Sequence, residues 1–286
     1  MTGATYPKIA HPGRKSAIAL RALVYLAALI TVAVLVFLVA YILIKGIPYL
    51  KPDLFSWKYT SDNVSMVPAI INTVLMTALS LLIAAPFGIF AAVYLVEYAK
   101  RGSKFVAAVR VTAETLAGIP SIVYGLFGML FFVTRLQWGL SLIAGACTLA
   151  VMILPLILRT TEEALKSVPD MYREGSFGLG AGRLRTVFSI VLPAAVPGIL
   201  AGVILGIGRI VGETAALIYT AGTVARVPEN LFSSTRTLSV HMYSLAREGL
   251  HIDQTYATAV VLLVVVVGVN ALSSMTAHRL IKRFGG

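Results

Sequence analysis

Charged residues are scarce in this 286-residue chain, and their scarcity excludes a soluble domain. Only 13% of the residues are charged, 58% are hydrophobic and the mean hydropathy is +0.88. Soluble domains carry about 25% charged and about 45–50% apolar residues. The abundance of aliphatic side chains excludes a disordered chain. The single cysteine, Cys147, excludes a disulfide-stapled scaffold. A polytopic membrane protein is the class that remains.

The chain also lacks the motifs of common catalytic and nucleotide-binding sites. It has no G-x-x-x-x-G-K-[ST] loop to hold the phosphates of ATP, and its glycines at 178–182 have the wrong spacing for a dinucleotide site. Its four histidines form no H-E-x-x-H motif, so we expect interfacial side chains rather than metal ligands. No serine–histidine or paired-aspartate constellation is visible at membrane depth. We therefore expect a chain that is not an enzyme and has no cofactor or metal of its own.

Long hydrophobic runs are what the chain has in abundance. Six of them are long enough for a helix to cross a hydrocarbon core of about 30 Å, which takes about 20 residues. They span residues 22–44, 67–96, 116–134, 140–158, 194–220 and 257–277. The fold class predicted from them is all-α, a polytopic membrane protein with six transmembrane helices.

Basic residues are distributed unevenly over the connections between these runs. Sixteen Lys and Arg residues lie on the side that holds both termini, and seven lie on the other side. Because cytoplasmic loops are enriched in Lys and Arg, both termini are predicted to be cytoplasmic. The net charge of +12 then reflects topology, and nucleic-acid binding is a remote alternative. The predicted organisation is a cytoplasmic tail at 1–21 and one transmembrane domain at 22–286, with a long cytoplasmic loop at 159–193.

The fifth run contains the only two charged residues inside a predicted span. Arg209 and Glu213 are four residues apart, on the helix face that also carries the glycines at 198, 202 and 206. A charge near mid-membrane costs about 2.5–3.5 kcal/mol on insertion scales, so we expect the two to pair along one continuous helix. The alternative is an ion pair that only fixes helix packing. We prefer a functional role, because a guanidinium offers a fork of donors that suits phosphate oxygens.

Three uncharged polar side chains are weaker candidates for lining a pathway. They are Asn72 and Thr73 in the second run and Ser121 in the third. The alternative is structural, since Ser and Thr hydroxyls in membrane helices commonly bond carbonyls of their own helix. Pro86 and Pro120 are expected to bend their helices.

The loop at 159–193 carries the most specific pattern in the chain. It resembles the EAA loop of ABC importer permeases, E-A-A-x-x-x-G followed nine residues later by I-x-L-P, with two small residues replacing the alanines. The matching positions are Glu174, Gly175, Ser176, Gly180, Ile190, Leu192 and Pro193. An ordinary loop helix on the membrane surface is the alternative. The resemblance implies an ABC type I importer permease fold, in which this loop docks in a groove of a cytoplasmic ATPase subunit.

Two further segments narrow the resemblance to phosphate importer permeases. Residues 116–128 (L-A-G-I-P-S-I-V-Y-G-L-F-G) and 208–217 (G-R-I-V-G-E-T-A-A-L) are similar to the third-helix and fifth-helix signatures of these permeases. Such permeases come as a pair, called PstC and PstA, and the G-E-T-A form and the block at 237–243 are more similar to PstA. The resemblance implies a role in phosphate transport for Arg209 and Glu213.

The resemblance also implies partners and a location. They are a PstC-like second permease, two PstB-like cytoplasmic ATPase subunits that bind ATP and Mg, and a PstS-like extracytoplasmic phosphate-binding protein. The long outer segment at 222–254 is expected to contact that binding protein. The location is a prokaryotic cytoplasmic (inner) membrane. Two alternatives stay open: a permease for another oxyanion such as sulfate, and an ion-gradient-driven carrier that acts alone.

Overall fold

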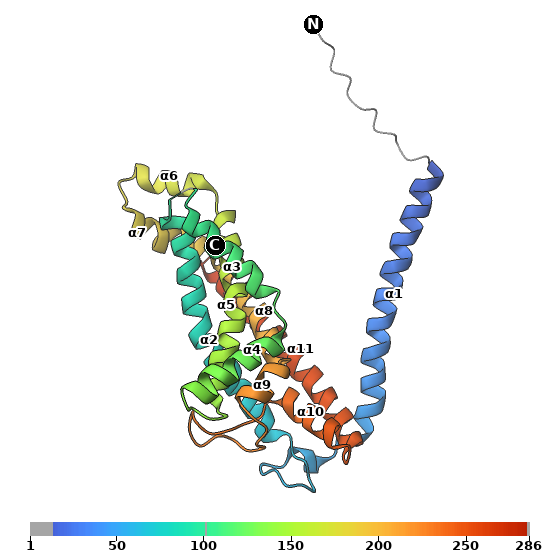
Figure 1. The fold of residues 1–286 in the computed structure, drawn as a ribbon. Helices are drawn as coiled ribbons and strands as arrows, with labels where there is room; N and C mark the ends of the chain where they lie inside the picture. The colour runs from blue at the N-terminus through green and yellow to red at the C-terminus, as the bar shows by residue number, and fades with distance from the viewer. Residues whose placement is uncertain (1–13, 101, 285–286) are drawn as a thin grey trace.

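The computed structural model describes residues 14–100 and 102–284, and every regular element in these ranges is helical (Figure 1). The prediction of an all-α fold is confirmed. Residues 1–13 of the predicted tail lie outside the described residues. The α-helices are α1 (Arg14–Gly46), α2 (Val67–Val93), α3 (Lys104–Ala117), α4 (Ser121–Gly128), α5 (Leu142–Ser167), α6 (Asp170–Gly178), α7 (Arg183–Thr186), α8 (Leu192–Val211), α9 (Ala215–Thr220), α10 (Leu238–Glu248) and α11 (Ile252–Phe284). Short 3₁₀ turns lie at Ile47–Tyr49 and Pro52–Phe55, and π turns at Tyr94–Tyr98, Met129–Arg135 and Val187–Val191.

Five helical stretches are long and apolar enough to cross a membrane, and a bent pair supplies a sixth crossing if it is counted as one span. The bent pair is α3 with the stretch Ser121–Arg135, at an angle of 101°. Pro120 directly precedes α4, and a proline disfavours helical geometry in the residue before it. The Tyr124 hydroxyl in α4 donates to the Leu116 carbonyl of α3 at 2.8 Å. The predicted span at 116–134 is therefore broken near its start, as Pro120 indicated.

α5 lies at the centre of the bundle, packed between α2 and α8. Its side chains Leu149, Met152 and Ile153 are fully buried in the central core. On α8, a Cβ added to Gly198 would lie 2.6 Å from the Cβ of Ala164 in α5. The glycine face of α8 therefore lets two helix backbones approach closely.

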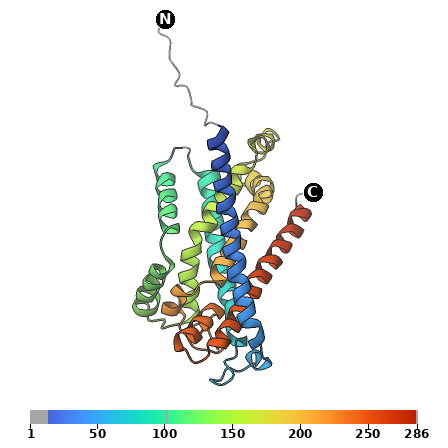
Figure 2. The ribbon, with the colours of Figure 1, turned by 90° about the vertical axis from the view of Figure 1, so that its right-hand side faces the viewer.

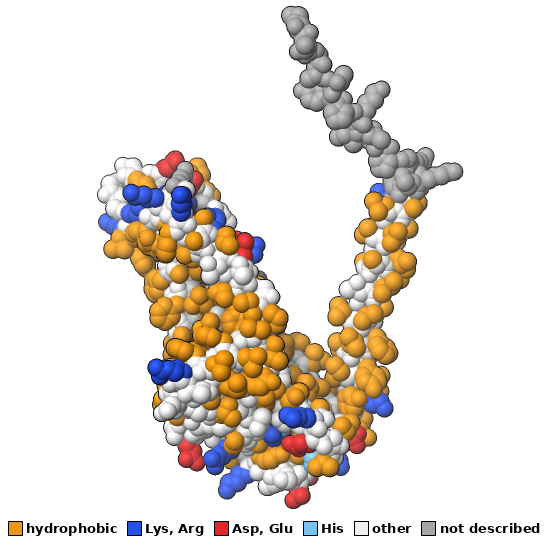
Figure 3. All heavy atoms as spheres, in the orientation of Figure 1, with side chains coloured by type: hydrophobic (Ala, Val, Ile, Leu, Met, Phe, Trp, Pro, Cys, Tyr) orange, Lys and Arg blue, Asp and Glu red, His pale blue; other side chains and the backbone are white. Residues whose placement is uncertain are grey.

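The connections gather at two ends of the molecule (Figures 1 and 2). α6 and α7, the start of α1 and the end of α11 lie toward one end, and α10 lies at the other. Figure 3 shows charged side chains mainly at these ends and hydrophobic side chains over the length between them. α1 stands away from the bundle over most of its length and meets α11 near Gly46. A hydrophobic middle between two charged ends is the pattern of a membrane-spanning bundle.

Candidate functional site

The predicted helix at 194–220 is broken in two beside its charged residues. α8 ends at Val211 and α9 begins at Ala215. The expectation of a continuous helix in which Arg209 pairs with Glu213 is wrong. Within the described part of the chain, neither side chain belongs to any ion pair.

Each of these charges lies at a helix end that favours it. Arg209 is in the last turn of α8, where the partial negative charge of the carbonyl groups stabilises a cation. The Glu213 carboxylate accepts a hydrogen bond from the Ala216 N–H of α9, with 3.1 Å between Oε1 and N. The Glu213 carbonyl accepts another from the Ser239 hydroxyl at 2.6 Å. Glu213 therefore fastens α9 to α10, and its carboxylate does not neutralise Arg209.

Two side chains from other spans approach the Arg209 region. The Tyr124 hydroxyl lies within electrostatic range of the guanidinium. Asn270 of α11 lies beside Gly208, where an added Cβ would be 3.5 Å from the amide Oδ1. Sequence reasoning missed both residues. Asn270 had a signal, because an amide inside a valine-rich span commonly makes interhelical contacts, whereas nothing distinguished Tyr124.

Of the weaker polar candidates, Asn72 and Thr73 hold the outer segment in place, and Ser121 lies at the bend. Asn72 is fully buried and donates its amide to two backbone carbonyls of the outer segment, at 3.0 and 3.1 Å. The Thr73 hydroxyl donates to the Ala69 carbonyl at 2.7 Å and accepts the Leu238 N–H at 2.9 Å. Ser121 is half-buried at the first position of α4. The structural alternative, a hydroxyl that bonds a carbonyl of its own helix, is thus observed for Thr73.

The EAA-like segment folds into α6 and α7 at the end of the bundle where α1 starts and α11 ends (Figure 1). Glu174 and Gly175 are exposed on α6. Ser176 is buried, with its hydroxyl 2.9 Å from that of Thr186 in α7. Gly180 follows α6 with a φ of +82°, a conformation that glycine adopts at little cost. Ser176 therefore joins the two helices, whereas Gly175 and Gly180 face outward.

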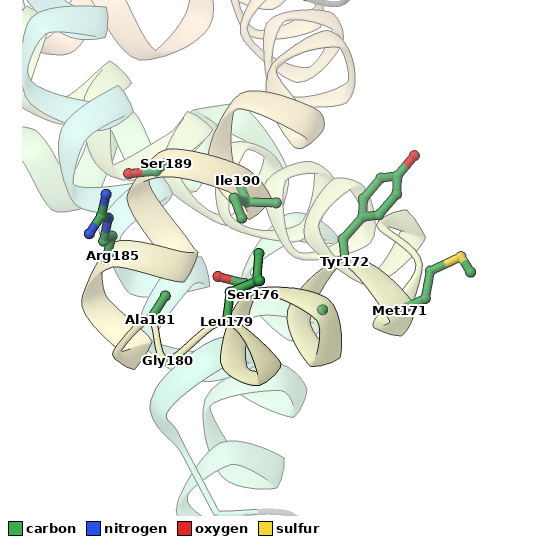
Figure 4. A pocket seen from close by; sticks show the side chains of 10 residues that line it. Met171, Tyr172, Ser176, Leu179, Gly180, Ala181, Arg185, Ser189 and Ile190 are labelled. Carbon is green, nitrogen blue, oxygen red and sulfur yellow. The ribbon is translucent and has the colours of Figure 1, made fainter.

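A groove of about 570 Å³ lies along this hairpin (Figure 4). It is lined by Met171, Tyr172, Gly175, Ser176, Leu179, Gly180, Ala181, Arg185, Ser189 and Ile190. Figure 4 shows Met171 and Tyr172 at one side of the hairpin and Arg185 and Ser189 at the other. Leu179 is 91% exposed and Met171 is 69% exposed. Leu192 and Pro193 begin α8, and Leu192 packs on the adjoining core. Exposed apolar side chains beside a groove are typical of a protein–protein contact.

One arginine holds the hairpin to the spans. The Arg173 guanidinium pairs with Glu97 at the end of the α2 stretch, with 2.7 Å between Nη2 and Oε1. It also donates to the carbonyls of Leu165 and Val168 at the end of α5, at 2.9 and 2.7 Å. Sequence reasoning missed this contact, because 76 residues separate the two charges and neither local pattern indicates the other.

His241 also differs from the expectation of interfacial histidines. It is fully buried in α10. Burial lowers its pKa to about 3, and the nearby positive charge of Arg236 adds to the effect. His11 lies outside the described residues. Across the two described ranges, no group of three or more His, Cys, Asp or Glu side chains is placed to hold a metal ion.

Comparisons with known proteins agree with this architecture. Residues 84–284 match the family described as binding-protein-dependent transport system inner membrane component. The chain is 36% identical over 245 residues to the probable ABC transporter permease protein YqgI of Bacillus subtilis (strain 168), covering 79% of this chain and 81% of that protein. It is 35% identical over 204 residues to the phosphate transport system permease protein PstA of Haemophilus influenzae (strain ATCC 51907 / DSM 11121 / KW20 / Rd), covering 71% and 72%.

A solved structure shares the fold. A chain of the bacterial alginate ABC transporter, in complex with an alginate pentasaccharide-bound periplasmic protein, aligns with a TM-score of 0.70 at 18% identity. The alignment covers 94% of this chain and 96% of that chain. The predicted fold is confirmed by this likeness.

Proposed function

Because the chain belongs to the binding-protein-dependent transport system inner membrane component family, we propose that it is a permease subunit of an ATP-driven importer of inorganic phosphate. Membership makes it a multi-pass membrane transport subunit and not a catalytic enzyme. In the proposal it forms half of the translocation path. A second, PstC-like permease forms the other half.

The observation that carries the substrate proposal is Arg209 at the break between α8 and α9. Its guanidinium has no carboxylate partner among the described residues, and a planar fork of donors suits a phosphate oxyanion. Transporters commonly build ion sites at the ends of broken spans. The name of the Haemophilus relative supports phosphate. The alginate transporter has the same fold, so the fold alone does not select the substrate.

The hairpin of α6 and α7 is the proposed contact with two PstB-like ATPase subunits, which bind ATP and Mg. The groove and the exposed Leu179 and Met171 offer an apolar surface outside the spans. Arg173 fastens α6 to the ends of α2 and α5. A displacement of the hairpin by the ATPase would therefore move these spans. The proposal places both termini and the hairpin in the cytoplasm of a prokaryotic cell. The outer segment then faces a PstS-like binding protein.

Reconstitution tests this proposal. The chain is co-purified with its second permease and ATPases and placed in liposomes, with binding protein and labelled phosphate on one side and ATP on the other. We expect phosphate uptake that requires ATP and is not displaced by equimolar sulfate. Sulfate uptake in place of phosphate uptake would support a permease for another oxyanion. Uptake by the purified single chain under an ion gradient would support a carrier and contradict the proposal.

A further inference from the structure

Near the outer end of the bundle, Arg236 is a buried cation without a counter-charge. It is 4% exposed, and its Nε and Nη2 atoms have no hydrogen-bond partner. Its Nη1 atom makes one long hydrogen bond, 3.5 Å to the Thr223 carbonyl. No carboxylate among the described residues lies within ion-pair distance. A buried, unpaired charge is strongly unfavourable, so these donors need a partner that the described residues do not supply.

Two neighbouring side chains also have unused polar atoms. The Arg236 guanidinium lies over the Tyr59 ring, 4.7 Å from its centroid. The ring of His241 meets Tyr59 edge-on, with 6.1 Å between centroids. Neither ring nitrogen of His241 has a partner in hydrogen-bond geometry, although the Val64 backbone lies near. The Oδ1 atom of Asn72 is also buried without a partner, and the Asn72 amide donates to the Arg236 carbonyl at 3.1 Å.

The unused atoms are mostly donors. Arg236 offers N–H groups from Nε and Nη2, and a histidine that stays neutral offers one N–H. The low pKa of His241, about 3, keeps its ring neutral near pH 7. One positive charge with several unpaired donors in a buried setting suits a small inorganic oxyanion. The Tyr59 ring lies under the guanidinium and restricts where the fork of donors can move.

A short hydrogen-bonded series leads from the residue after Arg236 to the break in the fifth span. Thr237 follows Arg236, and its hydroxyl is 3.1 Å from that of Ser239. Ser239 donates to the Glu213 carbonyl at 2.6 Å. Thr237, Ser239 and Glu213 are all buried. The series therefore starts at the residue next to Arg236 in the chain and ends at the α8–α9 junction, four residues after Arg209.

We propose that Arg236 and His241 form a second anion-binding site, which holds a small inorganic oxyanion on the outer side before it reaches Arg209. The inference rests on the proposed function for the identity of the anion as phosphate. It adds a binding step between delivery at the outer surface and contact with the arginine at the helix break.

Equilibrium binding of radiolabelled phosphate tests the site. The purified complex of both permeases and the ATPases is used, without binding protein and without ATP. The parent complex is expected to show two classes of phosphate-binding site, one at Arg209 and one at Arg236. Arg236→Met loses one class and Arg209→Gln loses the other. Methionine keeps much of the side-chain volume and removes the buried charge, a replacement that commonly preserves folding. Arg247→Met, at an exposed arginine of α10, is the matched control and keeps both classes.

A second variant keeps the result interpretable. Arg236→Lys retains the charge but loses the fork of donors, so it should weaken this class about tenfold or more, the effect of one lost charged hydrogen bond. Parental affinity and stoichiometry in assembled Arg236→Met would overturn the site. That result would mean that water, and not an anion, satisfies the Arg236 donors in the parent complex. A parent complex that binds sulfate and not phosphate contradicts the proposed substrate, and the same variants then test the site with sulfate. A parent that binds neither anion overturns the site.

Discussion

In the proposed function, Arg209 can bind an anion because the carboxylate four residues away is engaged elsewhere. Glu213 accepts the Ala216 N–H at the start of α9, and Arg209 is stabilised by the carbonyl end of α8. An incoming oxyanion therefore does not have to displace an internal carboxylate. The guanidinium would release it when movement of the helix ends changes the geometry of the site.

This arrangement gives different expectations for the two charged residues. Arg209→Gln should lower phosphate uptake about a hundredfold or more, because two charged hydrogen bonds of about 1.5–3 kcal/mol each are lost. Glu213→Gln should stay near the parental rate, because the amide oxygen still accepts the Ala216 N–H. ATP-driven uptake in proteoliposomes measures both, and size-exclusion chromatography verifies assembly. Equal loss in the two variants would favour an Arg209–Glu213 ion pair during transport.

His241 should make the complex less stable in acid. The unfolded histidine takes up a proton below its ordinary pKa of 6.5, whereas the folded one does so only near its lowered pKa of about 3. The unfolded state binds more protons in this window, so stability falls as the pH drops from 6.5, by up to about 1.4 kcal/mol per pH unit. In phosphate-free buffer, the Tm of the parent should fall more steeply over this window than that of His241→Gln. Parallel Tm curves would contradict the prediction.

At the scale of helices, hydropathy located the spans but not their breaks. The six predicted runs correspond to five long helical stretches and one bent pair. Hydropathy averages over a window, so it does not register a break of three residues. The break before Ala215 depends on the Glu213 hydrogen bond to a new helix end. The bend at Pro120 had a local signal, because proline disfavours helical geometry in the residue before it. Proline alone does not decide the outcome, since Pro86 and Pro155 lie inside α2 and α5, which continue past them.

The EAA-like segment was likewise located from the sequence by its motif, whereas its contacts were not predicted. The spacing from Glu174 to Pro193 placed the loop, but it gave no sign that Ser176 faces Thr186 inside the hairpin. The Arg173–Glu97 pair depends on how the chain folds back over 76 residues. The same holds for Arg236 and Tyr59, which meet only in the tertiary structure.

The turn between α6 and α7 should be sensitive at one glycine and tolerant at another. Gly180 has a φ of +82°, so Gly180→Ala should destabilise the turn by about 1–2 kcal/mol and reduce coupling of ATP hydrolysis to uptake. Gly178 lies within α6 and has open space where a Cβ would be. Gly178→Ala is therefore the matched control, and alanine at this last position of α6 should leave the helix at least as stable.

Uptake per ATP hydrolysed, measured in proteoliposomes, distinguishes these variants. Gly178→Ala should retain the parental ratio, whereas Gly180→Ala should lower it with normal membrane insertion. A parental ratio in both variants would show that the shape of the turn does not matter for coupling.

At the scale of the whole molecule, a continuous set of contacts joins the hairpin to Arg209. Arg173 ties α6 to the end of α5, and α5 packs along α8 through close contacts such as Gly198 with Ala164. Arg209 lies in the last turn of α8, which ends at Val211. Closely packed helices move as units because side chains interdigitate at high density. A displacement of α6 should therefore reach Arg209 through α5 and α8.

This connection couples ATP to transport only if the hairpin lies in the cytoplasm and α10 lies outside. Two exposed leucines test the orientation: Leu179 beside α6 is 91% exposed, and Leu250 between α10 and α11 is 81% exposed. Because Cys147 is the single cysteine, Cys147→Ala gives a background for Leu179→Cys and Leu250→Cys. A membrane-impermeant maleimide should label Leu250→Cys in intact spheroplasts and Leu179→Cys only after permeabilisation. The excess of Lys and Arg on the side of the hairpin gives the same orientation. Labelling of Leu179→Cys in intact spheroplasts would place α6 outside the cell, where no ATPase could drive it.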